Sequence, residues 1–179
     1  ELKSHGTASE NGINGGVELK NVSGLLAGYE LSGGGIIDYL DGNIKITNLF
    51  LENGKNHLEI DGRIDETLDL AFSLEGPELN RIVPALEGMI NAHGSVSGSK
   101  EFPELSGKIE GDTLSYGDYS MGRISSDINV STKLDGEIKS SIEVGDIQIA
   151  GYHVAQAAAE LTGSLENHHL EVRIDSDHG

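Results

Sequence analysis

The sequence contains no cysteine and no tryptophan, and phenylalanine and tyrosine make up only 4 % of its 179 residues. Without cysteine the chain can form neither disulfides nor thiolate metal sites. Hydrophobic residues account for 36 % of the sequence, whereas 25 residues are glycine. Residues that could build a core are therefore scarce for an ordinary compact domain of this length.

Positive charge is also scarce. Twelve Lys and Arg against 30 Asp and Glu give a formal net charge of −18. A chain with this balance repels nucleic acid and anionic membrane surfaces, and no aromatic-rich basic patch offsets the repulsion, so we expect no nucleic-acid partner. The acidic residues are best explained as a solvated outer face.

Long hydrophobic runs are absent. No apolar stretch approaches the roughly 18 residues of a membrane-spanning helix, and the N-terminus has neither an initiating Met nor a signal-peptide pattern. We expect the sequence to be a section of a longer protein.

What the sequence does contain is alternation, seen in the stretch Met89–Gly111. Ile90 to Val96 are apolar at every second position, and Leu105 to Ile109 repeat the pattern after a loop that holds Pro103. Period-two alternation is typical of a strand with one apolar and one polar face. The stretch therefore predicts a pair of strands whose apolar face needs a cover.

The same pattern recurs along the whole chain and predicts about 11 or 12 strands, with Gly-rich and Asn/Ser turns between them. The expected strands cover residues 17–20, 29–31, 36–40, 44–51, 58–64, 68–74, 114–116, 124–130, 134–144 with 147–149, and 170–174.

Two local signals refine this pattern. Asp41-Gly42 predicts a hairpin turn, because both residues tolerate positive φ. In the next strand Ile44 and Ile46 fall on one parity and Leu49 and Leu51 on the other, which predicts a bulge or bend near Asn48.

Two segments carry helical signals. In Pro77–Glu87 apolar residues recur at helical spacing, and Pro84 interrupts them, so we expect one kinked helix or two short turns as a helical insertion. In Tyr152–Leu161 the alanine-rich composition allows a helix, but apolar residues at every second position favour a strand.

Several glycines fall on the apolar parity of the expected strands: Gly62, Gly94, Gly107 and Gly136. On the concave side of a bent sheet a glycine relieves crowding and permits curvature. We therefore expect a curved sheet, although the high glycine content alone could also produce these positions.

Catalytic and metal-site motifs are missing. The sequence has no G-x-S-x-G, no P-loop, no HExxH and no dinucleotide-binding glycine pattern. Neighbours on a strand point to opposite faces, so His168 and His169 cannot jointly hold one metal, and Asp61, Asp65 and Asp69 fit a solvated surface better than a site. We expect no enzyme activity, no cofactor and no metal.

A resemblance to a known family rests on three consecutive elements. The helix-like segment Leu79–Gly88 precedes the strand motif GSVSG at Gly94–Gly98, and the loop then leads to PELSG at Pro103–Gly107. In this order the elements resemble the TamB family, and the similarity extends over most of the chain.

The resemblance implies a fold, a location and partners. It implies an all-β protein, residues 1–179 forming one repeat-built domain, in which a long curved antiparallel sheet folds into a half-pipe (β-taco) with a hydrophobic groove. It also implies a periplasmic section of an inner-membrane-anchored protein that works with the outer-membrane barrel TamA. The groove would carry phospholipid acyl chains or outer-membrane protein segments between the two membranes.

The candidate groove residues share the apolar parity of their strands: Leu58, Ile60, Leu68, Leu70, Phe72, Leu74, Ile90, Leu105, Ile109, Ile124, Ile128, Ile138, Ile142, Ile147, Ile149, Leu170, Val172 and Ile174.

A second reading of the residues stays open. The chain could belong to a β-helical adhesin or passenger domain, in which the same apolar residues form a closed core and the function is surface attachment. The two readings differ in whether the apolar face is covered.

Overall fold

Twelve strands and one short 3₁₀ helix make up the computed structural model, which describes residues 2–9 and 12–176. In chain order the elements are β1 (Leu2–Ser9), β2 (Gly12–Leu26), β3 (Tyr29–Leu40), β4 (Asn43–Asn53), β5 (Asn56–Ile64), β6 (Thr67–Gly76), η1 (Leu79–Arg81), β7 (Leu86–Ser99), β8 (Pro103–Tyr116), β9 (Tyr119–Ser131), β10 (Ile138–Ile149), β11 (Tyr152–Gly163) and β12 (His168–Asp175).

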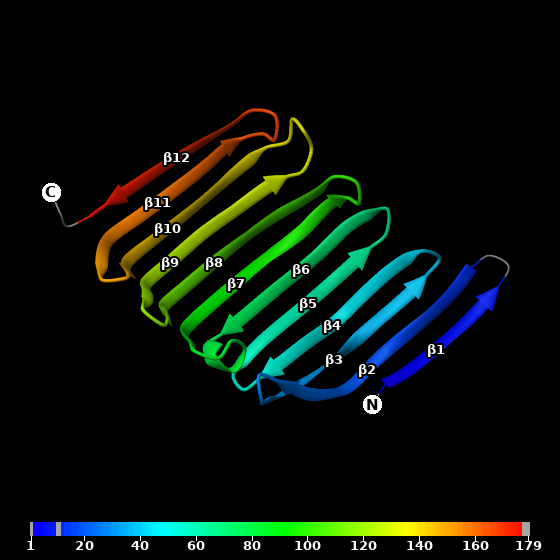
Figure 1. Cartoon of the computed structure of the whole chain (residues 1–179). Helices are drawn as coiled ribbons and strands as arrows, with labels where there is room; N and C mark the ends of the chain where they lie inside the picture. The colour runs from blue at the N-terminus through cyan, green and yellow to red at the C-terminus, as the bar shows by residue number, and fades with distance from the viewer. Residues whose placement is uncertain (1, 10–11, 177–179) are drawn as a thin grey trace.

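The strands form one sheet in which each strand pairs with its neighbours in the sequence. The order runs from β1 to β12 without a crossover, and every pairing is antiparallel. Figure 1 shows a single layer with β1 and β12 at opposite ends and with η1 beside the turns of one long border. The predicted fold class, an all-β antiparallel sheet with almost no helix, is confirmed, and the open sheet is consistent with a curved half-pipe.

The turn between β3 and β4 has the geometry that its sequence predicts. Asp41 and Gly42 both have positive φ, 48° and 85°. A two-residue turn with positive φ at both positions matches the twist of the strands that it joins, and Asp-Gly is a preferred sequence for it. The hairpin prediction is confirmed.

The predicted bulge near Asn48 is also confirmed. Asn48 has a φ of 49°, and the register between β4 and β5 shifts between Ile46 and Leu49. Before the shift Ile46 lies opposite Gly62, and after it Leu49 lies opposite Ile60. Gly62 and Ile60 share a parity, so the extra residue returns the apolar residues of β4 to one face.

Several strands are longer than the alternation suggested. The segments 29–31 and 36–40, predicted as separate strands, form the single strand β3, because the glycines between them pair with Leu51 and Phe50 of β4. Residues 114–116 are the end of β8. The strand predicted from Leu134 begins only at Ile138, and Leu134 lies in the preceding loop with 63 % of its surface exposed.

The helical signals give little helix. Within 77–87 the regular part is the single turn Leu79–Arg81, and β7 already begins at Leu86. Pro84 has no N–H to continue a helix, and Ala85 has a φ of 70°. The segment 152–161 is extended and belongs to β11, as its alternation predicted.

Glycines on the apolar parity make room for large neighbours. Gly94 lies opposite Phe72 in β6, and a side chain at Gly94 would meet the Phe72 ring at 2.8 Å. On its other side Gly94 lies opposite Gly107. Gly136, predicted on a strand, instead lies in the loop before β10, next to the Ser131 side chain.

Almost nothing in this sheet is buried. Among the described residues only two hydrophobic side chains are buried, Leu79 with 7 % of its surface exposed and Ile138 with 4 %. A single layer leaves both of its faces without a packing partner, so the usual two-layer core is missing.

Candidate functional site: an apolar face and a charged hollow

Cross-strand register brings the apolar parities of neighbouring strands onto one surface, here called the apolar face. Residues directly opposite each other on antiparallel strands lie on the same face. One continuous row crosses nine strands from β2 to β10, and its members are Val17, Ile37, Ile46, Gly62, Leu70, Val96, Leu105, Val130 and Ile138.

A second row extends the apolar face to the last strand. It consists of Val22, Gly33, Leu51, Leu58, Leu74, Ala92, Ile109, Ser126, Ile142, Ala159 and Val172. Exposure is high at members of both rows, with Leu105 and Ile142 at 38 % and Val172 at 56 %. The apolar face is therefore continuous across the sheet and uncovered.

Register places 16 of the 18 predicted groove residues on the apolar face. The other two, Ile147 and Ile149, follow Asp146, whose φ of 53° interrupts the alternation of β10. Beyond this interruption Ile147 lies opposite Val154 and Ile149 opposite Tyr152.

The sequence-based list omitted residues that register adds to the apolar face. Ile37, Ile46, Val96 and Val130 belong to the first row. The alternation already marked Ile46, Val96 and Val130, so this signal could have identified them. Ile37 was hidden because its neighbour Ile36 is equally apolar and only register separates the two.

One border of the sheet is held by a group of polar contacts that we name the η1 clamp: Asn53, Asn56, Glu78, Leu79 and Arg81. The Asn56 side chain donates to the Glu78 carbonyl at 2.7 Å and accepts from the Glu78 N–H at 2.8 Å. Asn53 donates to the Glu30 carbonyl at 2.9 Å. Asn53 and Asn56 are 4 % and 3 % exposed.

The η1 clamp positions an apolar side chain at the border of the apolar face. A side chain placed at Gly76 would meet Leu79 at 3.2 Å and Ile90 at 3.0 Å, so these two residues lie over the glycine. The Glu78 carboxylate binds the Arg81 guanidinium at 2.7 Å, and Arg81 stacks over the Tyr29 ring at 4.8 Å. Leu79 is thereby fixed as a cover for this border.

Glu78 has a lowered pKa. The main cause is the hydrogen bond that its carboxylate accepts from the Lys55 N–H at 3.2 Å, and the Lys55 and Arg81 side chains add to it. Hydrogen bonds to a carboxylate favour its charged form. Ionised Glu78 therefore joins the β4–β5 turn to η1.

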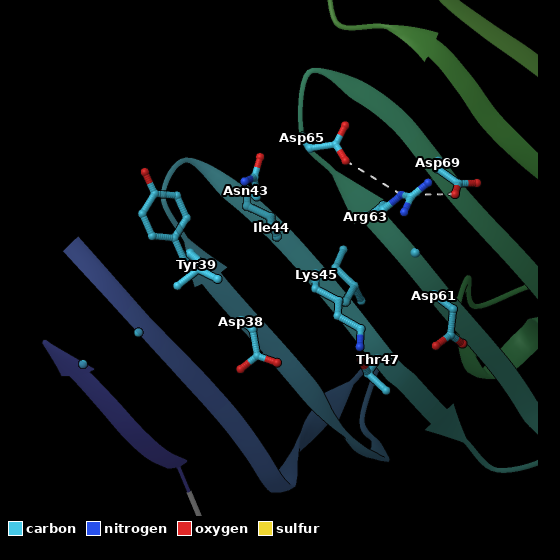
Figure 2. A pocket seen from close by; sticks show the side chains of 15 residues that line it. Asp38, Tyr39, Asn43, Ile44, Lys45, Thr47, Asp61, Arg63, Asp65 and Asp69 are labelled. Atoms are coloured by element: carbon cyan, nitrogen blue, oxygen red, sulfur yellow. Dashed lines mark ion pairs between the residues drawn. The ribbon is translucent and has the colours of Figure 1, made fainter. Parts of the chain in front are cut away.

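A hollow of about 1140 Å³ lies over β1 to β6, at the N-terminal end of the sheet. Its lining takes residues of both parities, among them Ile44 and Ile46 together with the charged Asp38, Lys45 and Arg63. Figure 2 shows these charged side chains on three adjacent strands, with Arg63 between Asp65 and Asp69. None of the 18 predicted groove residues lines this hollow.

Charge in the hollow is mixed. The Arg63 guanidinium lies 3.4 Å from the Asp69 carboxylate and 3.8 Å from that of Asp65. Asp65 also accepts hydrogen bonds from the Thr67 N–H and hydroxyl, both at 2.8 Å, and these bonds lower the pKa of Asp65. Asp61 accepts from the Asn48 N–H at 2.7 Å, which ties the hollow to the bulge in β4.

Residues 2–9 and 12–176 contain no group of three or more His, Cys, Asp or Glu placed to hold a metal ion. The same residues contain no helix long and apolar enough to cross a membrane.

A single-layer antiparallel meander with an uncovered apolar face defines the class of open β-sheet proteins, in which apolar side chains lie on an exposed face instead of in a closed core. A family model described as "TamB, N-terminal domain" matches residues 1–179. The chain belongs to this TamB family. No solved structure matches it.

Proposed function

We propose that the apolar face holds the apolar parts of clients that move between the inner and outer membranes, either phospholipid acyl chains or outer-membrane protein segments. The observation that carries this proposal is the continuity of the apolar rows together with the burial of only two hydrophobic side chains in the described part of the chain. Soluble monomers rarely expose contiguous apolar patches above a few hundred Å², so the apolar face calls for an occupant.

The dimensions suit an acyl chain. Twelve strands at a spacing of about 4.8 Å give an apolar face roughly 50 Å long. Half the hydrocarbon thickness of a bilayer is about 15 Å, so at least one lipid tail fits along the sheet. An apolar surface without directional hydrogen bonds matches the chemistry of such a tail.

A client strand would bind mainly through its backbone. Backbone N–H and C=O groups along a sheet edge can pair with an incoming strand. We keep outer-membrane protein segments as the second client for this reason.

Family membership extends the proposal to the cellular context. We propose that residues 1–179 act as one non-catalytic periplasmic module, without a cofactor, in an inner-membrane-anchored protein. Its proposed partner is the outer-membrane barrel TamA, reached through the full-length protein, and the proposed outcome is outer-membrane biogenesis, including autotransporter assembly.

The adhesin alternative has less support. A β-helical passenger domain needs a closed core, whereas the described sheet is an open meander with two buried hydrophobic residues. We therefore prefer binding at the apolar face over surface attachment.

Binding of an apolar fluorescent probe tests the proposal with a matched pair of variants. Ile142 lies on the apolar face and Ile36 on the opposite face, and each is 38 % exposed. Ile142→Asp should weaken probe binding at least fivefold, whereas Ile36→Asp should leave it unchanged, with both proteins folded by circular dichroism.

Native mass spectrometry of the parent supplies the second readout. Co-purifying lipid should appear as added mass and should decrease in Ile142→Asp. A parent that binds neither lipid nor probe, or variants that lose binding equally, would contradict the proposed function.

A further inference from the structure

A third row of cross-strand neighbours lies on the apolar face, next to the border that carries η1 (Figure 1). From β4 to β12 its members are Asn53, Asn56, Gly76, Ile90, Gly111, Ile124, Val144, Ala157 and Ile174. The only polar side chains in this row are those of Asn53 and Asn56. Both belong to the η1 clamp, so the row changes character where η1 lies on the sheet.

Leu79 occupies the third row from above. It is one of only two buried hydrophobic side chains in the described part of the chain, and unlike Ile138 it does not lie on a strand. Gly76 is buried and has no side chain of its own, and a carbon added there would meet Leu79 at 3.2 Å. The chain therefore supplies its own apolar side chain to this part of the apolar face.

The segment 77–85, which contains η1, forms a unit that is separate from the strand ladder. The N–H groups of Ile82 and Val83 both donate to the Leu79 carbonyl at 2.9 Å, so the turn is closed by bonds within the segment. Its links to the sheet are the side-chain contacts of the η1 clamp. Because no strand pairing of the described sheet passes through the segment, it can move while the pairings stay intact.

With η1 in this position, one buried acceptor lacks a donor. The Asn53 side-chain nitrogen donates to the Glu30 carbonyl, but its side-chain oxygen is buried and has no hydrogen-bond partner in residues 2–9 and 12–176. Asn53 lies opposite Asn56, which binds Glu78, so the η1 clamp closes around it. A buried polar atom without a partner carries a desolvation penalty, and this penalty opposes the closed position.

We infer that η1 is a displaceable cover, whose Leu79 side chain competes with apolar ligands for the third row of the apolar face. In the closed position the η1 clamp holds Leu79 over Gly76 and Ile90. In the open position the segment 77–85 moves away, and a ligand can contact Gly76 and Ile90 instead. The competition rests on the proposed function, whereas the opening motion does not.

Amide hydrogen exchange of the parent protein measures the opening without any ligand. The Glu78 N–H donates to the Asn56 side chain at 2.8 Å, so it exchanges when the η1 clamp opens. It should exchange at least tenfold faster than the slowest amides of β5 and β6, which are released only when the ladder opens. Exchange of the Glu78 N–H as slow as these ladder amides would overturn the inference.

A matched pair of arginine variants tests the competition. Arg81→Ala removes the guanidinium that binds Glu78 at 2.7 Å and stacks over Tyr29, so binding of the apolar fluorescent probe should tighten at least threefold. Arg173→Ala is the control, because Arg173 binds Glu171 at the same 2.7 Å but lies on β12, away from the η1 clamp. It should leave probe binding unchanged. Unchanged or weaker binding in a folded Arg81→Ala protein would contradict a displaceable cover.

A cross-link tests the same motion within one protein. A carbon added at Gly54 would lie 2.7 Å from Cδ of Arg81, so the double variant Gly54→Cys, Arg81→Cys brings two thiols within reach of a disulfide. The chain has no other cysteine. The oxidised form, in which η1 is held closed, should bind the probe at least fivefold more weakly than the reduced form. Equal binding by the two forms would also overturn the inference.

These outcomes separate the cover from the proposed function. A parent that binds no probe contradicts the proposed function, and exchange of the Glu78 N–H still shows whether η1 opens. If Ile142→Asp weakens probe binding but neither Arg81→Ala nor oxidation of the double variant changes it, the proposed function stands. The cover is then a fixed part of the fold, and the inference is wrong.

Discussion

The N-terminal strands β2 to β4 and the middle strands β5 to β9 differ in how regularly they pair with their neighbours. Register shifts interrupt each pairing from β2–β3 to β4–β5, and residues with positive φ, Asn21, Gly35 and Asn48, lie at the shifts. The pairings β5–β6, β6–β7 and β8–β9 run without a shift. The β7–β8 pairing has one shift, between Glu87 and Met89 near the start of β7. Extra residues therefore interrupt every pairing of the first region but only one pairing of the second.

The difference teaches how a sheet without a core is shaped. In the N-terminal region bulges keep apolar residues on one face and accompany the charged hollow. In the middle region glycine makes room for large apolar side chains, because Gly94 leaves space for Phe72 on the opposite strand. Covering a glycine with an aromatic neighbour is a known way to stabilise a sheet.

The largest expected effect on stability comes from adding a side chain at Gly94 in the middle strands. Gly94→Val should lower the free energy of unfolding by about 3 kcal/mol, because the new side chain collides with the Ser106 carbonyl oxygen and with the Phe72 ring. Urea unfolding followed by circular dichroism measures the change. The control is Gly24→Val in β2, where nothing lies within 4 Å of the added carbon, and its effect should stay within about 0.5 kcal/mol.

The next effect tests the border that joins the two regions. Leu79→Ala removes the cover over Gly76 and Ile90 and should cost about 2–3 kcal/mol in the same assay, as expected for truncating a buried leucine. Leu134→Ala, at a leucine with 63 % exposure in a loop, should cost about 0.5 kcal/mol or less. Equal costs would mean that Leu79 is not a structural cover.

A smaller effect tests the bulge of the N-terminal region. Asn48→Val places a β-branched residue at a φ of 49° and should cost about 1–2 kcal/mol. Asn48→Gly should be nearly neutral, because glycine adopts positive φ readily. If valine were tolerated as well as glycine, the bulge would not depend on the backbone conformation of Asn48.

The smallest effect is a pH dependence at the η1 clamp. The pKa of Glu78 lies below its ordinary value of 4.5 in the folded protein, so its stabilising contribution is present above about 4.5 and is lost as the pH falls through the lowered folded value. Melting temperatures at decreasing pH should therefore fall less for Glu78→Gln than for the parent. Glu66→Gln, at an exposed turn residue, should follow the parent curve.

Sequence alone predicted what depends on neighbours along the chain. Period-two alternation identified the strands, Asp41-Gly42 the hairpin, and the parity switch the bulge at Asn48. It underestimated β3 because glycine weakens a strand only until a partner strand pairs with it. Leu134 was assigned to a strand because its parity matched, although its loop interrupts the pairing.

The two candidate sites also differ in how far the sequence predicts them. The apolar face could be listed from parity, apart from Ile37, and register then supplied the rows. The hollow could not be predicted, because Asp38, Lys45 and Arg63 are surface charges on separate strands until register sets them opposite one another. The burial of Asn56 likewise depends on its hydrogen bonds to Glu78 at the start of η1, more than 20 residues away.

The unbroken order from β1 to β12 means that the length of the sheet follows directly from the number of strands. Because each described strand pairs only with the strands next to it in sequence, one hairpin can be removed or duplicated without rerouting the chain, and the flanking strands keep their directions. Each hairpin changes the length of the sheet by about 10 Å. The length of such a sheet therefore depends on the number of its hairpins.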